Sequence, residues 1–174
     1  MKLSTLAKAL ALVSITAVGA ANAAPVPVLT YNGSDYYLTT NTANTWTAGE
    51  ADAVAMGGHL VTINDAAEET ALRTAFGGTS LFWIGFTDQA VEGTFAWISG
   101  EAVTYTHWNA GEPNNAGGED YTVVNWDTRN GAWNDLPNGS YARGIIEVRV
   151  PEPGSLALAG LALLGLGASR RRKA

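Results

Sequence analysis

The chain has 174 residues, no cysteine and a formal net charge of −6, but this charge is spread unevenly. Six of its ten Lys and Arg lie within the first 8 or the last 5 positions, so residues 25–153 carry 4 basic and 16 acidic residues, a net charge of −12. Such a segment repels nucleic acid, whose binding depends on clustered basic side chains. Without cysteine and with only two histidines, the sequence also excludes a disulfide framework, a thiolate zinc site and a histidine-rich metal centre.

The first 24 residues have the pattern of a secretory signal peptide. Lys2 and Lys8 precede an uncharged stretch rich in Ala, Leu and Val, which ends in the small residues Ala21-Asn22-Ala23. A short apolar stretch with this kind of cleavage site directs export. A buried helix is the weaker alternative, because the stretch has no amphipathic stripe and ends at Pro25. We therefore expect residues 1–24 to be a signal peptide and the rest of the chain to be exported.

The segment after the signal peptide is predicted to begin with a hairpin and a helix. The Asn32-Gly33 turn predicts a hairpin between Val28–Tyr31 and Tyr36–Leu38. Apolar residues at roughly helical spacing then predict a helix over Trp46–Met56, which ends at Gly57-Gly58.

A second helix and a series of short strands complete this domain, which we place at residues 25–150. Asp65 and Glu68 have the spacing of a capping box, and the helix that they begin runs to Phe76, before Gly77-Gly78. Aromatic and β-branched runs predict strands at His59–Ile63, Leu81–Phe86, Thr94–Ile98, Tyr121–Trp126 and Gly144–Val150.

Oxygen-bearing side chains gather in the long stretch from Tyr105 to Asp120, which has little periodicity. A stretch of this length inside a compact domain is usually functional. Ca²⁺ takes six to eight oxygen ligands, mainly carboxylates and amides, and a cis bond before Pro113 would turn the flanking side chains toward one point. A merely solvated acidic loop is the alternative that spacing alone leaves open. The candidate ligands are Glu112, Asn114, Glu119 and Asp120, with Asn134 and Asp135 in a separate turn.

Three motifs give this segment a family resemblance. Trp83-Ile84-Gly85, Glu112-Pro113-Asn114 and Trp133-Asn134-Asp135 occur in the order and approximate spacing of the C-type lectin-like domain, and the resemblance covers residues 28–149. It implies an α+β double-loop fold in which the N- and C-terminal strands pair. Two helices flank small antiparallel sheets in that fold, and a long loop carries the binding site.

The resemblance also implies a ligand set for calcium and sugar. The principal Ca²⁺ site, whose ligands also hydrogen-bond two sugar hydroxyls, would consist of Glu112, Asn114, Glu119, Asn134 and Asp135. An auxiliary Ca²⁺ site, sharing Glu119, would use Asp88, Glu92, Asn115 and Asp120, although many family members have Asp where this chain has Asn115. Glu112 with Asn114 is the family's pairing for mannose, N-acetylglucosamine and fucose.

Two further expectations concern aromatic residues and the family's disulfides. The positions of the two usual disulfides fall near Ala53 with Ile146 and near Tyr121 with Asn138, where no cysteine stands, so we expect the first pair to pack as core. His107 is expected to face solvent or to be hydrogen-bonded within the loop. We expect Trp108 to support the loop and the core to contain Trp83, Trp97, Trp126 and Trp133.

The last 24 residues, 151–174, have three parts in a fixed order. Pro151-Glu152-Pro153 is followed by an uncharged run of 16 residues, 154–169, and a terminal Arg cluster. As a helix this run spans about 24 Å, less than the roughly 30 Å of a bilayer core. The three parts resemble a PEP-CTERM sorting signal of Gram-negative bacteria. That resemblance implies a transient inner-membrane anchor, cleavage by a sorting protease of the exosortase type, and an extracellular or cell-surface location. A permanent single-span anchor is the alternative.

Together these observations predict an exported, calcium-dependent carbohydrate-binding protein that is not an enzyme. Its expected partner is a glycan or exopolysaccharide, and its expected contact with the membrane is through the C-terminal tail only. Catalysis is disfavoured because Ca²⁺ is a poor activator of water and the role of ion ligand accounts for Glu112 and Glu119. The alternative is a calcium-stabilised protein-binding or extracellular-matrix module without sugar binding, because one fold can carry many functions.

Overall fold

The strands nearest the two ends of the domain pair with each other. The computed structural model describes residues 25–41, 44–126, 131–139 and 142–150, and in it β2 (Ser34–Leu38) runs antiparallel to β8 (Arg143–Arg149). This pairing of early and late strands is the one that the sequence predicts. The expected signal peptide, 1–24, and the sorting tail, 151–174, lie outside the described residues. Within the described part, no helix has the length and apolar character needed to cross a membrane.

The N-terminal hairpin forms as predicted. β1 (Leu29–Tyr31) pairs with β2 through a turn at Asn32 and Gly33, whose φ angles are 47° and 83°. Two successive positive φ values match the twist of the flanking strands, and Asn-Gly adopts them with little strain.

The strands form one mixed sheet in the order β1-β2-β8-β4-β6-β7. β4 (Phe82–Thr87) pairs with β6 (Tyr121–Val124), which pairs with β7 (Asn134–Leu136). Two short strands lie off this path, β3 (His59–Leu60) on β8 and β5 (Ala96–Trp97) on β4.

Two features of the sheet differ from the sequence-based expectation. β4 and β8 run parallel, whereas only antiparallel pairs were expected. Parallel neighbours need a long connection, and the segment from β5 to β7 supplies it. In addition, Asn134 and Asp135 lie in β7 and not in a turn, because they pair with Val123 and Thr122 of β6.

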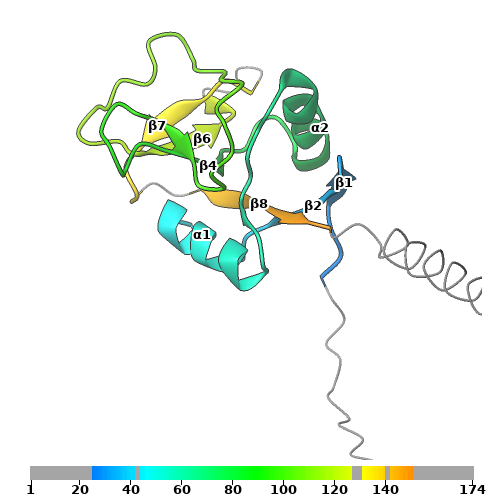
Figure 1. Cartoon of the computed structure of the whole chain (residues 1–174). Coiled ribbons are helices and arrows are strands. Elements are labelled where there is room, and N and C mark those ends of the chain that lie inside the picture. Colours follow the sequence, from blue (N-terminus) through cyan, green and yellow to red (C-terminus); the bar gives the residue numbers. More distant parts are fainter. Residues whose placement is uncertain (1–24, 42–43, 127–130, 140–141, 151–174) are drawn as a thin grey trace, which may run out of the picture.

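Two helices flank the β2–β8 ribbon (Figure 1). α1 (Trp46–Ala55) is capped by Thr45, whose side chain accepts from Ala48 N. α2 (Ala66–Phe76) is capped by Asp65, which accepts from the backbone N–H of Ala67 and Glu68. The predicted capping box is only half formed, because Glu68 Oε2 accepts from Asn64 N at 2.8 Å and not from the capping residue. Both helices end near positive-φ glycines, Gly57 and Gly77.

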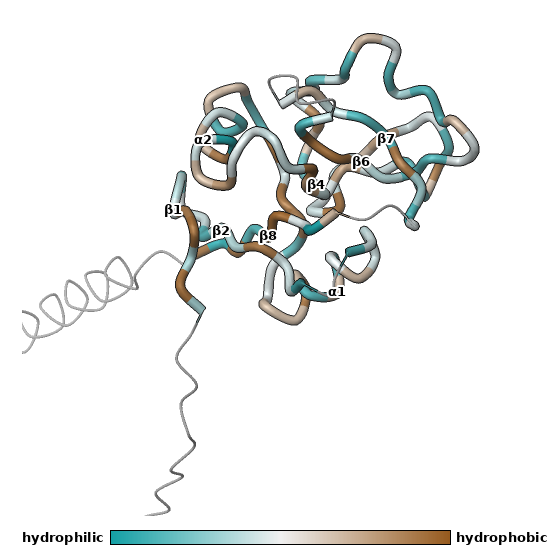
Figure 2. The backbone as a smooth tube through the Cα atoms, turned by 180° about the vertical axis from the view of Figure 1, so that it is seen from behind, coloured by the Kyte–Doolittle hydropathy of each residue, from teal (hydrophilic) through white to brown (hydrophobic). Residues whose placement is uncertain are grey.

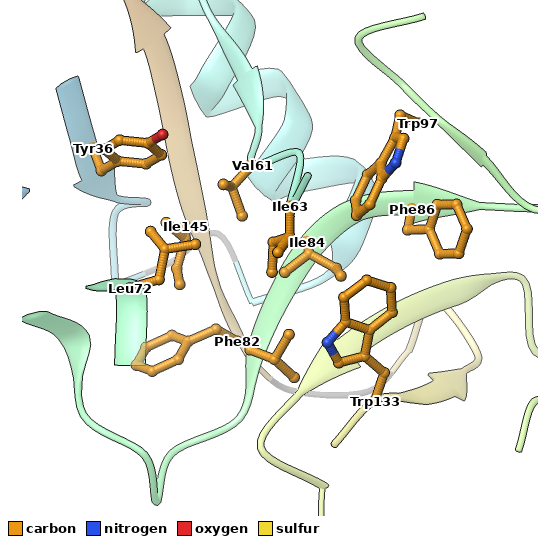
Figure 3. Close-up of a cluster of buried hydrophobic side chains, with 11 residues drawn as sticks. Tyr36, Val61, Ile63, Leu72, Phe82, Ile84, Phe86, Trp97, Trp133 and Ile145 are labelled. Atoms are coloured by element: carbon orange, nitrogen blue, oxygen red, sulfur yellow. The ribbon is translucent and has the colours of Figure 1, made fainter. Parts of the chain in front are cut away.

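The core has two clusters, one between the sheet and α2 that extends beneath the long loop, and one that includes Trp46 of α1 and Trp83 of β4. The hydrophobic positions gather along β4 and β8, whereas the outer loop is mostly hydrophilic (Figure 2). Trp97 and Trp133 are buried and pack edge to face, with ring centroids 5.8 Å apart (Figure 3). Trp83, Ala53 and Ile146 are also buried, as expected, but Trp126 is only half-buried.

Gly85 explains why the Trp83-Ile84-Gly85 motif ends in glycine. Its backbone N–H donates to Val61 O at 2.8 Å, and a Cβ at this position would collide with the carbonyl oxygen of Leu60. The segment after β3 can therefore cross β4 closely only where the side chain is absent. This contact holds β4 tightly against the segment after β3.

Candidate functional site

The long loop places the side chains on either side of Pro113 in contact. The Glu112–Pro113 peptide bond is cis, and Asn114 Nδ2 donates to Glu112 Oε2 at 2.5 Å. Glu112 is half-buried and Asn114 is exposed. The structure thus brings together the acceptor and the donor that the sequence predicts for a sugar site.

Asp135 connects this loop to the sheet. Its side chain is fully buried on β7, Oδ1 accepts from Asn114 N at 3.2 Å, and Oδ2 accepts from Asn115 N at 2.8 Å. A buried carboxylate that accepts backbone N–H groups is held in a fixed orientation. Asp135 therefore lies directly beneath the Glu112-Pro113-Asn114 motif.

Glu119 folds back onto the same part of the loop. Its Oε2 accepts from Ala116 N at 2.9 Å, and its own backbone N–H donates to Asn115 Oδ1 at 2.6 Å. Ala116 N also donates to Asn114 Oδ1 at 2.8 Å. Glu119 and Asn114 therefore approach one backbone N–H from two directions.

Asn134 supplies an oxygen that has no partner. The residue is 2% exposed, and its Nδ2 donates to Asp135 O at 2.7 Å. Its Oδ1 is buried and accepts no hydrogen bond. An unsatisfied buried acceptor costs about 1–3 kcal/mol, so such an atom at a candidate metal site calls for a ligand.

Burial and neighbouring carboxylates oppose the ionisation of Glu112 and Glu119. Burial, followed by the charges of Asp135 and Glu119, raises the pKa of Glu112. Burial also raises the pKa of Glu119, and the charge of Asp135 adds to this against the hydrogen bond from Ala116 N. Neither ion pair found among the described residues involves these three carboxylates.

The donor set fits a calcium ion. Carboxylates that repel one another and a buried amide oxygen without a donor are ligands of the hard type that Ca²⁺ takes. The described residues contain no group of three or more His, Cys, Asp or Glu already arranged around one point. The fit thus depends on the mixture of carboxylates with the amides of Asn114 and Asn134.

The auxiliary set is only partly assembled. Glu92 Oε1 accepts from Asn115 Nδ2 at 2.7 Å. Asp88 is 2% exposed, its Oδ2 accepts from Gly93 N at 2.9 Å, and its Oδ1 is buried without a partner. The backbone oxygen of Asp120 accepts a hydrogen bond from Asp88 N at 3.2 Å. Glu92 thus contacts Asn115, and Asp88 contacts Asp120. Among these four described residues, no hydrogen bond connects one pair to the other.

Glu69 is a residue that the sequence analysis missed. It lies on α2, is 5% exposed, and accepts from Tyr105 and His107 of the loop and from Trp133. Burial and this hydrogen bond to Glu69 raise the pKa of Tyr105 to about 12. The contact of His107 confirms that this side chain is hydrogen-bonded. The helical spacing of Glu69 to Leu72 and Phe76 is the signal that could have placed it on the buried face.

Trp108 supports the loop as expected. The side chain is half-buried, and its ring lies 4.9 Å from that of Phe95 and 5.9 Å from those of Phe86 and Trp133, centroid to centroid. A bridge between Trp108 and Trp133 joins the loop to the segment before β7. The aromatic cluster therefore fixes the start of the loop against the sheet.

The sequence profile of the family described as Lectin C-type domain matches residues 42–145. The chain belongs to the C-type lectin domain family. A second profile, for the PEP-CTERM protein-sorting motif, matches residues 149–173 and confirms the predicted nature of the tail of this C-type lectin domain protein.

Relatives and solved structures agree with this assignment. The chain is 35% identical over 108 residues to human C-type lectin domain family 17, member A, across 62% of this chain and 28% of that protein. The carbohydrate-recognition domain of cow CD23, solved in the presence of a GlcNAc2Man3 oligosaccharide, matches with a TM-score of 0.65 at 26% identity, over 75% of this chain and 98% of that one. A herring type II antifreeze protein shares the fold, with a TM-score of 0.65 at 21% identity over 70% of this chain and 95% of that one.

The curated relatives are longer than the matched region. The alignments span between 28 and 65% of their length. The family assignment therefore concerns the C-type lectin domain, and the activities of the whole relatives are not transferred to this chain.

Proposed function

We infer that this domain binds carbohydrate in a calcium-dependent manner through Glu112, Asn114, Glu119, Asn134 and Asp135. The observation that carries the proposal is the buried Asn134 Oδ1 without a donor, next in sequence to a fully buried Asp135. A cation at this place would satisfy that oxygen and offset the burial and the charge repulsion that together raise the pKa of Glu112 and Glu119. The ion supplies a positive charge to which sugar hydroxyls can bind.

The protein's own residues decide which sugar hydroxyls fit. Glu112 is an acceptor-only carboxylate and Asn114 carries amide donors, and the two side chains now bond to each other. A sugar with two vicinal equatorial hydroxyls arranged like the 3- and 4-hydroxyls of mannose offers a donor and an acceptor that replace this contact. We therefore favour mannose, N-acetylglucosamine and fucose. A shallow site of this kind binds a single sugar at about 1 mM, or about −4 kcal/mol, and many copies on a surface would raise the avidity.

The sorting motif supports a location of this binding outside the cell. The PEP-CTERM motif at residues 149–173 supports passage through an exosortase-type protease and an extracellular or cell-surface location. The natural partner would then be a surface glycan or an exopolysaccharide.

A protein-binding or matrix module is the second candidate function. The fold is shared with a herring type II antifreeze protein, so the fold alone is compatible with this function. A module of this kind would keep the fold and its calcium stabilisation but would not bind sugar, so the two functions differ in one measurable property.

A glycan array with and without EDTA separates the two functions. We expect the protein to bind mannose-type glycans in Ca²⁺ and to lose this binding in EDTA. Asp135→Asn keeps the shape of the side chain but removes one charge, and should abolish the signal. The double change Glu112→Gln with Asn114→Asp keeps the total charge, exchanges the acceptor and donor sides, and should move the preference toward galactose. Binding that is equal for mannose and galactose and unaffected by EDTA would contradict the lectin function.

A further inference from the structure

A single buried carboxylate on α2 connects two segments that carry the candidate site. Glu69 Oε2 accepts from Tyr105 OH and from His107 Nδ1, both at 2.8 Å. Its Oε1 accepts from Trp133 Nε1 at 2.7 Å. The side chain is 5% exposed, so these contacts replace the water that the carboxylate would otherwise bind.

The hydrogen bonds continue from these segments to the binding residues. Trp133 N donates to His107 O at 2.8 Å, and Asn109 N donates to Trp133 O at 2.9 Å. Glu112 N in turn donates to Asn109 O at 3.0 Å. An unbroken chain of contacts thus runs from α2 to Glu112. Trp133 is also the residue directly before Asn134 and Asp135 in the sequence.

The packing of α2 against the segment before β7 leaves little freedom. A Cβ added at Gly131 would lie 2.7 Å from Arg73 Cδ and 3.2 Å from Glu69 Cδ. This close approach holds Trp133 over the helix, where its N–H reaches the carboxylate. Displacement of Glu69 would therefore release both the loop and the start of β7.

We propose that Glu69 is a positioning residue for the sugar and calcium site, an inference that rests on the proposed function. It contacts neither the ion nor the sugar in this scheme and acts through Trp133, Tyr105 and His107. Partners of this indirect kind orient the ligating groups, and their loss typically lowers metal affinity about 10- to 100-fold.

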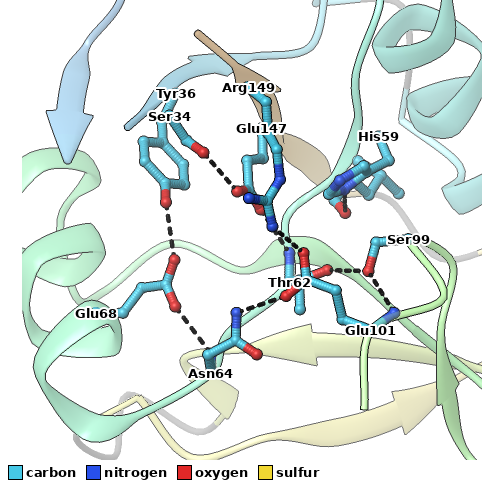
Figure 4. Close-up of polar contacts among 11 residues, drawn as sticks. Ser34, Tyr36, His59, Thr62, Asn64, Glu68, Ser99, Glu101, Glu147 and Arg149 are labelled. Carbon is cyan, nitrogen blue, oxygen red and sulfur yellow. Dashed lines mark hydrogen bonds and ion pairs between the residues drawn. The ribbon is translucent and has the colours of Figure 1, made fainter. Parts of the chain in front are cut away.

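The neighbouring Glu68 provides a matched control. It lies on the same helix, is 6% exposed, and also accepts from a tyrosine, Tyr36 OH, at 2.8 Å. Its second oxygen accepts from Asn64 N at 2.8 Å, and Figure 4 shows this group among Ser34, Glu147 and Arg149, in a different set of contacts. Both carboxylates support buried structure, but only Glu69 contacts the segments of the site.

The test compares Glu69→Ala, Glu69→Gln and Glu68→Ala in the full-length protein by two readouts. The first is the Ca²⁺ concentration for half-maximal retention on mannose-agarose. We expect Glu69→Ala to raise it about tenfold and Glu68→Ala to leave it unchanged. Glu69→Gln should restore it toward the wild-type value, because its amide oxygen can accept from Trp133 while its NH₂ group faces Tyr105 and His107. An equal effect of the two alanine variants would overturn the proposal.

The second readout is hydrogen exchange, which does not depend on sugar binding. In EDTA, Glu69→Ala should speed exchange in peptides covering residues 105–112 and 131–136, and Glu68→Ala should not. If the wild type itself is not retained on mannose-agarose, the proposed function fails, and exchange alone then decides the role of Glu69. Unchanged exchange in both peptides would overturn that role.

A milder pair of variants covers the case in which the alanine variants do not fold. Tyr105→Phe removes one donor to Glu69, and Tyr36→Phe removes the equivalent donor to Glu68. We expect faster exchange over residues 105–112 in Tyr105→Phe only. The same result in both tyrosine variants, or in neither, would contradict the proposal.

Discussion

The β2–β8 end of the domain with Glu68 of α2, here called the base, differs from the long loop in how buried side-chain oxygens find donors. At the base, both oxygens of Glu68 and both oxygens of Glu147 have donors, among them Tyr36, Ser34 and Thr62 (Figure 4). In the loop region, Asn134 Oδ1 and Asp88 Oδ1 are buried without one. The carboxylates of Glu68 and Glu147 thus find donors within the chain, whereas these two oxygens near the loop do not.

Missing hydrogen-bond donors identify the candidate site better than raised pKa values do. Burial followed by neighbouring acid groups raises the pKa of Glu112, and burial first of all raises that of Glu68 at the base. A raised pKa is therefore common to both regions and identifies neither. What distinguishes the loop region is that Asn134 Oδ1 and Asp88 Oδ1 are buried without donors, although the carboxylate of Asp135 has them.

The largest expected effect on stability belongs to the base. Ile146 is fully buried on β8 and pairs with Tyr37 and Leu60. Ile146→Ala removes buried methyl groups and should lower the free energy of unfolding by about 2–5 kcal/mol, which urea unfolding measures. The folded variant should keep the wild-type Ca²⁺ requirement for mannose retention. A changed requirement would show that base and loop are not separable in this way.

Calcium should stabilise the domain by a smaller amount that depends on the loop. For a dissociation constant of about 10⁻³ M, roughly 10 mM Ca²⁺ contributes about 1.4 kcal/mol, or roughly 5 °C in Tm for a domain of this size. Thermal melts in Ca²⁺ and in EDTA measure this difference. Asp135→Asn should remove it, and superimposed melts of the wild type in the two conditions would contradict the calcium site.

The smallest expected effect is a pH dependence from the base. Burial, with contributions from Glu147 and Asp65, raises the pKa of Glu68 above its ordinary 4.5. A raised pKa means that this stabilising contribution is complete below about pH 4.5 and is lost as the pH rises through the raised value. In EDTA, the free energy of unfolding of the wild type should therefore fall more steeply above pH 4.5 than that of Glu68→Gln. Parallel pH profiles in urea unfolding would show that Glu68 does not carry the effect.

Local sequence signals predicted most elements because they act over a few residues. The Asn32-Gly33 turn, the cap at Asp65 and the glycines after each helix determine backbone angles directly, so the hairpin and both helices form where expected. Strand β7 was missed because its three residues, Asn134–Leu136, carry polar ligands, and only their pairing with β6 makes them a strand. The parallel contact of β4 with β8 likewise depends on residues far apart in the chain.

The candidate site also contains residues that local sequence signals predict and residues that only the fold reveals. Glu112 and Asn114 could be found from sequence because the motif places them on either side of one proline, and the structure brings them into contact. The role of Glu69 could not, because its three donors lie 36 to 64 positions further along the chain. Nor does any local pattern show that Asn134 Oδ1 is left without a donor, since this follows from burial.

A crystal structure of the protein in Ca²⁺ and methyl α-mannoside tests the central claim most directly. We predict a Ca²⁺ ion about 2.3–2.6 Å from Asn134 Oδ1, with the carboxylates of Glu112, Glu119 and Asp135 around it. Two hydroxyls of the sugar should lie on the ion, between Glu112 and Asn114. Mannoside bound away from this cluster, or a cluster without the ion at roughly 10 mM Ca²⁺, would contradict it.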